Sequence, residues 1–247
     1  MHKPTERVLN VLTLLAEHIE GLTLTDIAQK LSIPKSTISP ILQEMTTQKF
    51  LYLNQVTSKY TIGISAYYVA ESFNAQNTIF PELKKKMAHI CNTLNEICQV
   101  GILTGSDITY ILKEEPATSS PIKIISHVGK KIPAHCTALG KALLSNLSLK
   151  ELHALLPKNL TKFTTNTITD FNILYEQLLE IKKSHIAFES EEITEHLCCY
   201  AVPIVLPDKS QIALSISLPL FRTDDKKIEA AKKLLLQAKK ELELYNV

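Results

Sequence analysis

Apolar residues near the start of the chain recur every three or four positions and predict three short helices. Their stripes are Val8, Leu12, Leu15 and Ile19; Ile27, Ala28 and Leu31; and Ile38, Ile41, Leu42 and Met45. Thr23 and Asp26 can form a capping box at the second helix, and Pro34 suits the first position of the third. Ser32 and Ile33 leave only a tight turn between these two helices, so residues 23–48 predict a helix-turn-helix.

Two short segments that alternate apolar and polar residues follow the third helix. They are Leu51–Asn54 and Tyr60–Ile62, joined by residues 55–59. Such alternation over a short distance predicts a β-hairpin. Three helices followed by a hairpin make the layout of a winged helix-turn-helix, and about 60 residues suffice for such a domain to fold alone.

The third helix carries a short polar face opposite its apolar stripe, formed by Ser36, Pro40, Gln43 and Thr47. Hydroxyls can bind phosphates, and a Gln amide can bind an adenine edge. An ordinary pair of helices with a solvated polar face fits this segment equally well. The β-hairpin that follows it favours DNA binding. Pro40 has no N–H for the carbonyl of Ser36, so we expect a kink or a free carbonyl there. The residues expected at DNA are Lys35, Ser36, Thr37, Pro40, Gln43, Thr47 and Lys59.

Charge supports DNA binding only weakly. Residues 1–65 hold six basic and five acidic side chains, a net charge of +1, and the whole chain has only two arginines, Arg7 and Arg222. Phosphate neutralisation supplies most non-specific affinity, so one such domain binds DNA poorly. We therefore expect two copies to act on one duplex.

Beyond the hairpin the pattern predicts an α+β fold in which a mostly antiparallel sheet is flanked by helices. A linker helix is expected at Ile64–Asn77. The other expected helices are Ile79–Asn95, Thr137–Asn146, Lys150–Leu156, Asn172–Ser184 and Asp224–Tyr245. The expected strands are Ile97–Leu103, Ile108–Leu112, Ile122–Ser126, Ile186–Glu189, Cys199–Leu206 and Gln211–Leu218. The predicted domains are therefore 1–64, a linker helix at 65–78, and 79–247, whose sheet can carry a pocket on one face.

Composition narrows the class of protein. The 247 residues are 45% hydrophobic with a net charge of +2, which gives no general attraction to membranes. No apolar run reaches membrane-spanning length and no targeting segment is present, so we expect a cytoplasmic protein without membrane contact. The five cysteines contain no CxxC pair, which argues against structural zinc and a disulfide framework. No cofactor is expected.

Four segments together resemble the IclR family of bacterial transcription regulators over nearly the whole chain. They are LTLTDIAQKLSIPKSTISPIL with its hairpin, VGKKIPAHCTALGKALL, FTTNTITDFNILYEQLLEIKKSHIAFESEE, and CYAVPI followed by SISLPLFR. Each is short, but their order and spacing make the resemblance specific. It implies an N-terminal winged helix-turn-helix and a C-terminal GAF-like effector domain. It also implies dimers or dimers of dimers that bind palindromic DNA operators, and a small-molecule effector.

The resemblance also implies which residues contact the effector. They are Gly129, Ala134, His135, Gly140, Glu189, Cys199, Ser215 and Ser217. Ser215 and Ser217 lie two apart and so share a sheet face. Amide groups at the start of the helix after Cys136 can hold a carboxylate, which favours a small organic acid.

Each of these side chains also has an ordinary structural interpretation. Cys199 can be a small buried apolar group, His135 can be hydrogen-bonded inside the core, and Glu189 can form a surface ion pair. Lys141 is expected to be a structural or solvated helix residue. The chain departs from the family where His185 and His196 replace common glycines, and where Glu189 replaces a shorter Asp. We expect these changes to alter the loop beside the pocket.

These observations favour a transcriptional regulator whose operator affinity changes when a metabolite binds. The alternative, motivated by His185 and His196, is a regulator that needs no effector and uses its second domain only to oligomerise. An enzyme is the third class. Its best constellation is His135–Cys136 with Glu189 or Glu192, but adjacent residues of an extended segment point apart, so His135 cannot activate Cys136. No nucleophile elbow, phosphate loop or metal-ligand spacing is present, so catalysis is not expected.

Overall fold

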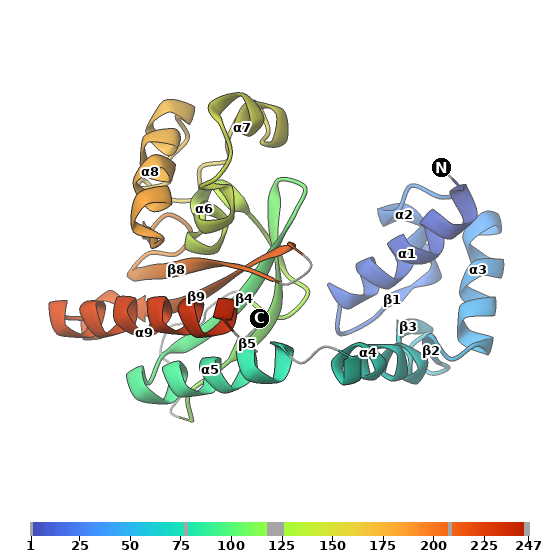
Figure 1. Cartoon of the computed structure of the whole chain (residues 1–247). Coiled ribbons are helices and arrows are strands. Elements are labelled where there is room, and N and C mark those ends of the chain that lie inside the picture. The colour runs from blue at the N-terminus through green and yellow to red at the C-terminus, as the bar shows by residue number, and fades with distance from the viewer. Residues whose placement is uncertain (1, 77–78, 118–125, 207–208, 245–247) are drawn as a thin grey trace. The chain divides into compact units, whose positions relative to one another are not determined.

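The computed structural model describes residues 2–76, 79–117, 126–206 and 209–244 and divides into two units, Met1–Thr78 and Ile79–Val247 (Figure 1). Among these residues no helix is both long and apolar enough to cross a lipid bilayer. The residues expected to form part of a strand at 122–125, and Tyr245 of the last helix, lie outside the described ranges.

The described residues of the first unit form four helices and a three-stranded antiparallel sheet in the order β1-β3-β2. The elements are α1 (Lys3–Ala16), β1 (Leu22–Thr23), α2 (Leu24–Lys30), α3 (Lys35–Thr47), β2 (Leu51–Asn54), β3 (Lys59–Ile62) and α4 (Ile64–Gln76). The predicted hairpin is confirmed, and β2 pairs with β3 from Leu51 opposite Ile62 to Asn54 opposite Lys59.

The helix-turn-helix is confirmed in its local details. The Thr23 hydroxyl accepts from the Asp26 amide, and the Asp26 carboxylate accepts from the Thr23 amide at 3.0 Å, which completes the capping box. The predicted stripe of α3 is buried at Ile38, Leu42 and Met45. These residues pack with α1 and α2 in one core, so the outer face of α3 is fixed by burial of its inner face.

Three details of this unit differ from the sequence prediction. Helix α1 ends at Ala16, and Ile19 is 71% exposed in the following turn, because the chain reverses at His18–Gly21 instead of continuing the helix. Pro34 precedes the first helical residue, Lys35, rather than occupying it. The short strand β1 was not predicted, since two residues carry too little pattern to be recognised.

The second unit contains five helices and six strands among its described residues. The helices are α5 (Ile79–Leu94), α6 (Ala138–Leu144), α7 (Leu149–Leu155), α8 (Phe171–Ser184) and α9 (Asp225–Leu244). The strands are β4 (Ile97–Thr104), β5 (Asp107–Glu114), β6 (Lys131–Pro133), β7 (Ala187–Ser190), β8 (Leu197–Val205) and β9 (Gln211–Pro219). Single 3-10 turns, η1 and η2, occupy Ala134–Cys136 and Leu220–Arg222.

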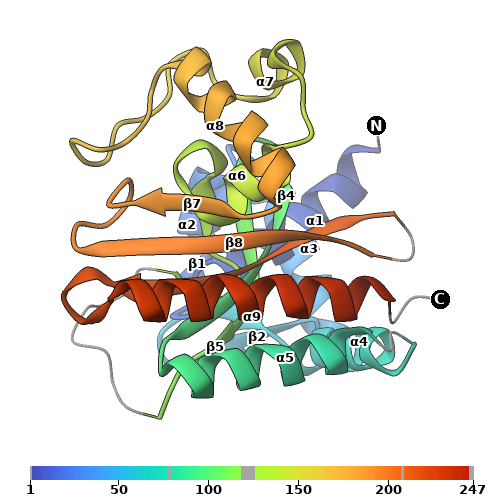
Figure 2. The same cartoon turned by 60° about the vertical axis from the view of Figure 1, so that its left-hand side comes forward.

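The strands form one antiparallel sheet in the order β6-β5-β4-β9-β8-β7, which confirms the predicted α+β class. Helices α5 and α9 cover one face, and α6 with α8 covers the other (Figures 1 and 2). Side chains of β8 and β9 alternate between these faces, so Val202 and Leu214 pack on α5 and α9, whereas Ala201 and Ala213 pack on α6.

A buried carboxylate joins the start of β4 to the start of α9. Glu96 is 1% exposed, and its two oxygens accept from Arg222 Nε at 2.8 Å and Arg222 Nη2 at 2.6 Å. Lys227 Nζ also donates to Glu96 Oε1, at 2.6 Å. Because β4 lies in the middle of the sheet, this cluster fixes where the C-terminal helix begins.

Candidate functional site

The outer face of α3 is the first candidate site, because it presents polar side chains on a rigid scaffold. Ser36, Pro40, Gln43 and Thr47 are exposed, as predicted, and Lys35 lies at the helix start. Thr37 is half-buried. The Thr47 hydroxyl donates to the Gln43 carbonyl at 3.1 Å, so it can only accept from a further partner.

Pro40 lies in the middle of α3, which remains helical from Lys35 to Thr47. Its ring nitrogen carries no hydrogen, so residue 40 donates nothing to the carbonyl of Ser36. The helix is therefore not broken, and the cost of Pro40 is one missing backbone hydrogen bond on the exposed face.

The hairpin beside α3 ends in a turn organised by Asn54. Its side-chain oxygen accepts from the amides of Val56 at 2.9 Å and Thr57 at 3.1 Å. Ser58 adopts a left-handed backbone with φ of 54°, and Val56 is 94% exposed at the tip. Lys59 opens β3 and is half-buried. The turn is thus held rigid while its tip remains open to solvent.

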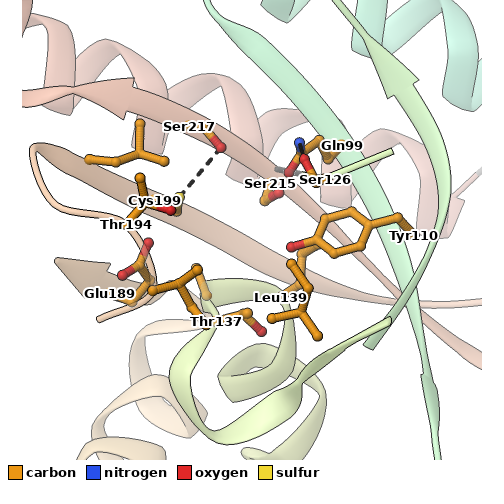
Figure 3. Close-up of a pocket in the computed structure, with 14 residues that line it drawn as sticks. Gln99, Tyr110, Ser126, Thr137, Leu139, Glu189, Thr194, Cys199, Ser215 and Ser217 are labelled. Atoms are coloured by element: carbon orange, nitrogen blue, oxygen red, sulfur yellow. Dashed lines mark hydrogen bonds between the residues drawn. The ribbon is translucent and has the colours of Figure 1, made fainter. Parts of the chain in front are cut away.

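The second candidate site is a pocket on the α6 face of the six-stranded sheet, with a cavity of about 40 Å³. Its walls come from all six strands, β4 to β9, from α6 and from the loop after β7 (Figure 3). The lining residues are Gln99, Tyr110, Ser126, Ile132, Thr137, Ala138, Leu139, Glu189, Ile193, Thr194, Leu197, Cys199, Ser215 and Ser217.

Four of the residues expected at an effector lie in this pocket because of the strand register. Glu189 of β7 stands opposite Cys199 of β8, and Cys199 stands opposite Ser217 of β9, so the three form a row across the sheet. The Cys199 thiol donates to the Ser217 hydroxyl at 3.4 Å. Ser215 lines the same pocket two residues before Ser217, as their spacing predicts.

Glu189 is the carboxyl group of the pocket and is not part of a surface ion pair. It is 4% exposed, and its Oε2 accepts from the Glu192 amide at 3.0 Å. Burial raises the pKa of Glu189 to about 7, although the interaction with Cys199 and the hydrogen bond from the Glu192 backbone oppose the shift. The carboxyl therefore changes charge close to neutral pH.

Five further polar residues of the pocket were not predicted as effector contacts, and they are Gln99, Tyr110, Ser126, Thr137 and Thr194. Gln99 of β4 donates to the hydroxyl of Ser126, and Tyr110 of β5 directs its hydroxyl into the pocket (Figure 3). Gln99 pairs with Ser215 across the β4–β9 ladder. Gln99 could have been noticed as a polar residue inside the apolar strand 97–103. Its neighbours could not have been predicted, because they depend on the order of strands in the sheet.

Four other expected effector residues do not line this cavity. Ala134, His135 and Gly140 are buried beside it, and Gly129 forms a turn with φ of 88° whose amide donates to the Tyr110 carbonyl at 2.8 Å. Nε2 of His135 lies 3.0 Å from the Thr161 carbonyl oxygen, and burial lowers the pKa of this imidazole. His135 is thus hydrogen-bonded inside the core, and its contact with an effector stays a prediction.

The start of α6 packs unusually closely on η1. A Cβ atom added at Gly140 would lie 2.0 Å from the Ala134 carbonyl oxygen, so only glycine fits there. The Gly140 amide is already used, because the Thr137 hydroxyl caps it at 3.0 Å. That leaves fewer free amides for a ligand than the sequence suggested.

Lys141 on α6 is completely buried, so a solvated role for it is wrong. Its ammonium group contacts the Glu192 carboxylate, whose side chain is 5% exposed, and donates to Gln177 Oε1 of α8 at 2.8 Å. Thr167 donates to the Glu192 carbonyl at 2.6 Å. This network fixes the loop after β7, whose residues Ile193 and Thr194 line the pocket.

The two histidines that replace common family glycines both lie in left-handed turns. His185 ends α8 with φ of 59°, and His196 precedes β8 with φ of 63°. Glycine adopts this conformation without a Cβ penalty, so histidine preserves the path of the chain at some conformational cost. His196 is also held by its amide, which donates to Glu191 at 2.7 Å.

The geometry at His135–Cys136 gives no activated nucleophile. The two residues lie in the 3-10 turn η1 rather than in the extended segment assumed from the sequence. Cys136 donates to the Pro133 carbonyl at 3.4 Å, and burial raises the pKa of its thiol far above its ordinary value. No group of three or more His, Cys, Asp or Glu side chains within the described ranges can hold a metal ion.

Both units of the chain match models of known protein domains. Residues 4–54 match the IclR helix-turn-helix domain, and residues 73–243 match the domain described as bacterial transcriptional regulator IclR C-terminal. A relative, the HTH-type transcriptional regulator BhcR of Paracoccus denitrificans, is 28% identical over 96% of this chain and 85% of its own.

Two solved structures show the same fold. An IclR transcriptional regulator from Alicyclobacillus acidocaldarius aligns with a TM-score of 0.90 at 20% identity over 100% of both chains. An IclR homolog from Microbacterium hydrocarbonoxydans, complexed with 4-hydroxybenzoate, aligns with a TM-score of 0.79 at 18% identity over 98% of this chain and 99% of that chain.

Proposed function

Because the chain belongs to the IclR family of bacterial transcriptional regulators, we propose that it binds a palindromic operator as a homodimer or a dimer of dimers. A small organic acid bound in the pocket of the second unit changes its operator affinity. The observation that carries the DNA-binding half is the exposed polar face of α3 beside a rigid hairpin. The effector half rests on the row Glu189–Cys199–Ser217 inside a cavity.

Reading of DNA is assigned to α3 and the hairpin. Gln43 can bond an adenine edge, Ser36 and Thr37 can bind phosphates, and Lys35 and Lys59 supply the nearby positive charge. With so few charges per unit, two units on one duplex are needed for useful affinity. Two-fold symmetry of the protein then matches two-fold symmetry of the operator.

Effector control requires different affinities of the ligand for two arrangements of the protein. A coupling of about 1–3 kcal/mol changes operator affinity roughly 5–150-fold. The bound 4-hydroxybenzoate of the Microbacterium homolog supports a carboxylic acid as the ligand class.

The test is selection of bound sequences from random DNA by the full chain, with and without a pool of small metabolites. Enrichment of paired, inverted half-sites and a change of affinity with the pool are expected. If half-sites are enriched but no metabolite changes the affinity, effector control is wrong, and the second domain serves only to oligomerise. Failure to enrich any sequence would overturn the DNA-binding assignment.

Replacing Pro40 with Arg is expected to tighten operator binding and to steepen its salt dependence. One added phosphate contact raises the slope of log K against log salt by about 0.9 per subunit, or about 1.8 for a dimer. Binding titrations over a range of KCl concentrations measure this slope. Pro40→Ala is the matched control, because it restores the backbone donor without adding charge and leaves the slope as in the wild type. A slope unchanged by Arg would show that position 40 faces away from DNA.

Helix α4 supports the oligomeric part of the proposal. Five large apolar side chains among the described residues of this helix are exposed, and exposed apolar side chains gathered on one element are typical of a contact surface. These side chains, each at least 50% exposed, are Ile64, Tyr67, Tyr68, Val69 and Phe73. A second copy of this helix is the partner that the proposed dimer provides.

Replacing Tyr68 with Glu is therefore expected to raise the dimer dissociation constant at least tenfold, because a charge would be buried against an apolar surface. Sedimentation velocity over a concentration series measures it. Asn10→Glu on the exposed side of α1 adds the same charge elsewhere in this unit and should leave association unchanged. Equal association of both variants would place the interface elsewhere.

A further inference from the structure

The charge of the pocket restricts what it can bind. Among the described residues that line it, Glu189 is the one carboxyl group, and no Lys, Arg or His side chain is present. The remaining polar groups are hydroxyls, one amide and one thiol. An anion entering this cavity therefore meets a carboxyl group without a cation to offset it.

The groups packed around Glu189 do not supply that cation. The titratable groups around it are Lys141 of α6, Glu192 of the following loop, Cys199 of β8, Tyr110 of β5, Cys136 of η1 and, on the other face of the sheet, Cys198 of β8. The ammonium group of Lys141 is already paired with Glu192. Burial raises the pKa values of the three thiols and the phenol, so these groups stay neutral.

The size of the cavity restricts the ligand further. A buried site needs about 10–15 Å³ of this kind of volume for each water-sized group. The pocket of about 40 Å³ thus holds roughly three such groups. Glu189 approaches from the β7 side, and the Tyr110 hydroxyl approaches from the opposite side (Figure 3).

We propose that the pocket takes a small monocarboxylic acid of about three to five non-hydrogen atoms, and that the acid binds together with one proton shared with Glu189. This inference rests on the proposed function and specifies its ligand. The proton comes from solvent and lies between the two carboxyl groups, since two carboxylates in hydrogen-bond contact cannot both stay ionised. Phosphate esters and dicarboxylates carry a second charge that the proton does not neutralise, so they are excluded.

The pH dependence follows from the order of ionisation. Below the pKa of Glu189, about 7, Glu189 already holds the proton, and the affinity for the acid is at its highest. Above that pH the proton must be taken up on binding, so affinity falls roughly tenfold per pH unit. A neutral amide of the same shape can donate to ionised Glu189, so its affinity does not fall in this way.

The experiment uses acid and amide pairs with the full chain at pH 6.5 and 8.5. The probes are glycolate with glycolamide, acetate with acetamide, propionate with propionamide, the larger benzoate with benzamide, and the phosphate ester phosphoglycolate. Calorimetry in buffers of different ionisation enthalpy measures affinity and proton uptake. We expect the small acids to bind more than tenfold tighter at pH 6.5, with close to one proton taken up at pH 8.5, and benzoate to bind more weakly than the small acids.

Variants separate the carboxyl group from the rest of the pocket. Glu189→Gln should remove the pH dependence and the proton uptake, whereas Glu180→Gln, on the exposed face of α8, should keep the wild-type profile. Both can be checked for folding by their thermal transitions. If Glu189→Gln does not fold, proton uptake by the wild-type protein still decides the question.

Several outcomes would overturn the inference. It is wrong if the acids bind equally at both pH values, if only the amides bind, or if phosphoglycolate binds more tightly than the small acids. None of these outcomes contradicts the proposed effector control. If no probe binds, the inference fails. Operator binding in the presence of a whole metabolite extract at pH 6.5 then shows whether effector control fails with it.

Discussion

Replacing Lys141 with Met is expected to lower the free energy of unfolding by about 3–5 kcal/mol. The substitution removes the ammonium group that balances Glu192 while both groups are almost fully buried. What remains is a buried carboxylate with only weak hydrogen bonds, such as that from the Ile168 amide at 3.4 Å. Denaturant unfolding followed by circular dichroism measures the loss.

A second variant keeps this prediction testable if the first does not fold. In Lys141→Met with Glu192→Met, both charges are gone and the volume is retained, so most of the lost stability should return. Lys183→Met on the exposed face of α8 is the matched control and should cost less than about 1 kcal/mol. A small loss in the single variant would mean that water or a nearby group solvates Glu192.

Replacing Glu96 with Gln is expected to cost about 2–3 kcal/mol, because the carboxylate accepts three charge-assisted hydrogen bonds from Arg222 and Lys227. A Gln side chain has one acceptor oxygen, and its amino group faces a cation. The loss should appear in unfolding of the second unit, measured by denaturant titration.

The matched control for Glu96 is an ion pair on the surface. Glu180 and Lys183 are 73% and 72% exposed, so Glu180→Gln should change stability by less than about 0.5 kcal/mol. Comparable losses in both variants would show that burial does not strengthen the Glu96 cluster.

The parts of the fold that depend on neighbours in sequence were predictable. The capping box of α2, the buried stripe of α3 and the hairpin each follow from patterns within a dozen residues. The shared face of Ser215 and Ser217 followed from strand alternation alone. The prediction for Ile19 was wrong because a stripe of apolar residues does not show at which residue a helix ends, and α1 ends at Ala16.

The parts that depend on the sheet order were not predictable from patterns. Gln99 and Tyr110 join Glu189 only because β4 and β5 lie beyond β9 in the sheet. The burial of Lys141 did have a signal in the sequence. Six of the seven residues of α6 are apolar or glycine, which is typical of a helix buried on all sides, so its single cation needed a partner.

The close approach of Gly140 to Ala134 has a mechanical consequence. Helix α6 and the turn before it have no free space between them, so neither can slide or rotate on its own. Leu139 of the pocket and Pro133 at the end of β6 therefore belong to one rigid body. We therefore expect a ligand that displaces Leu139 to displace β6, a strand at the edge of the sheet, together with it.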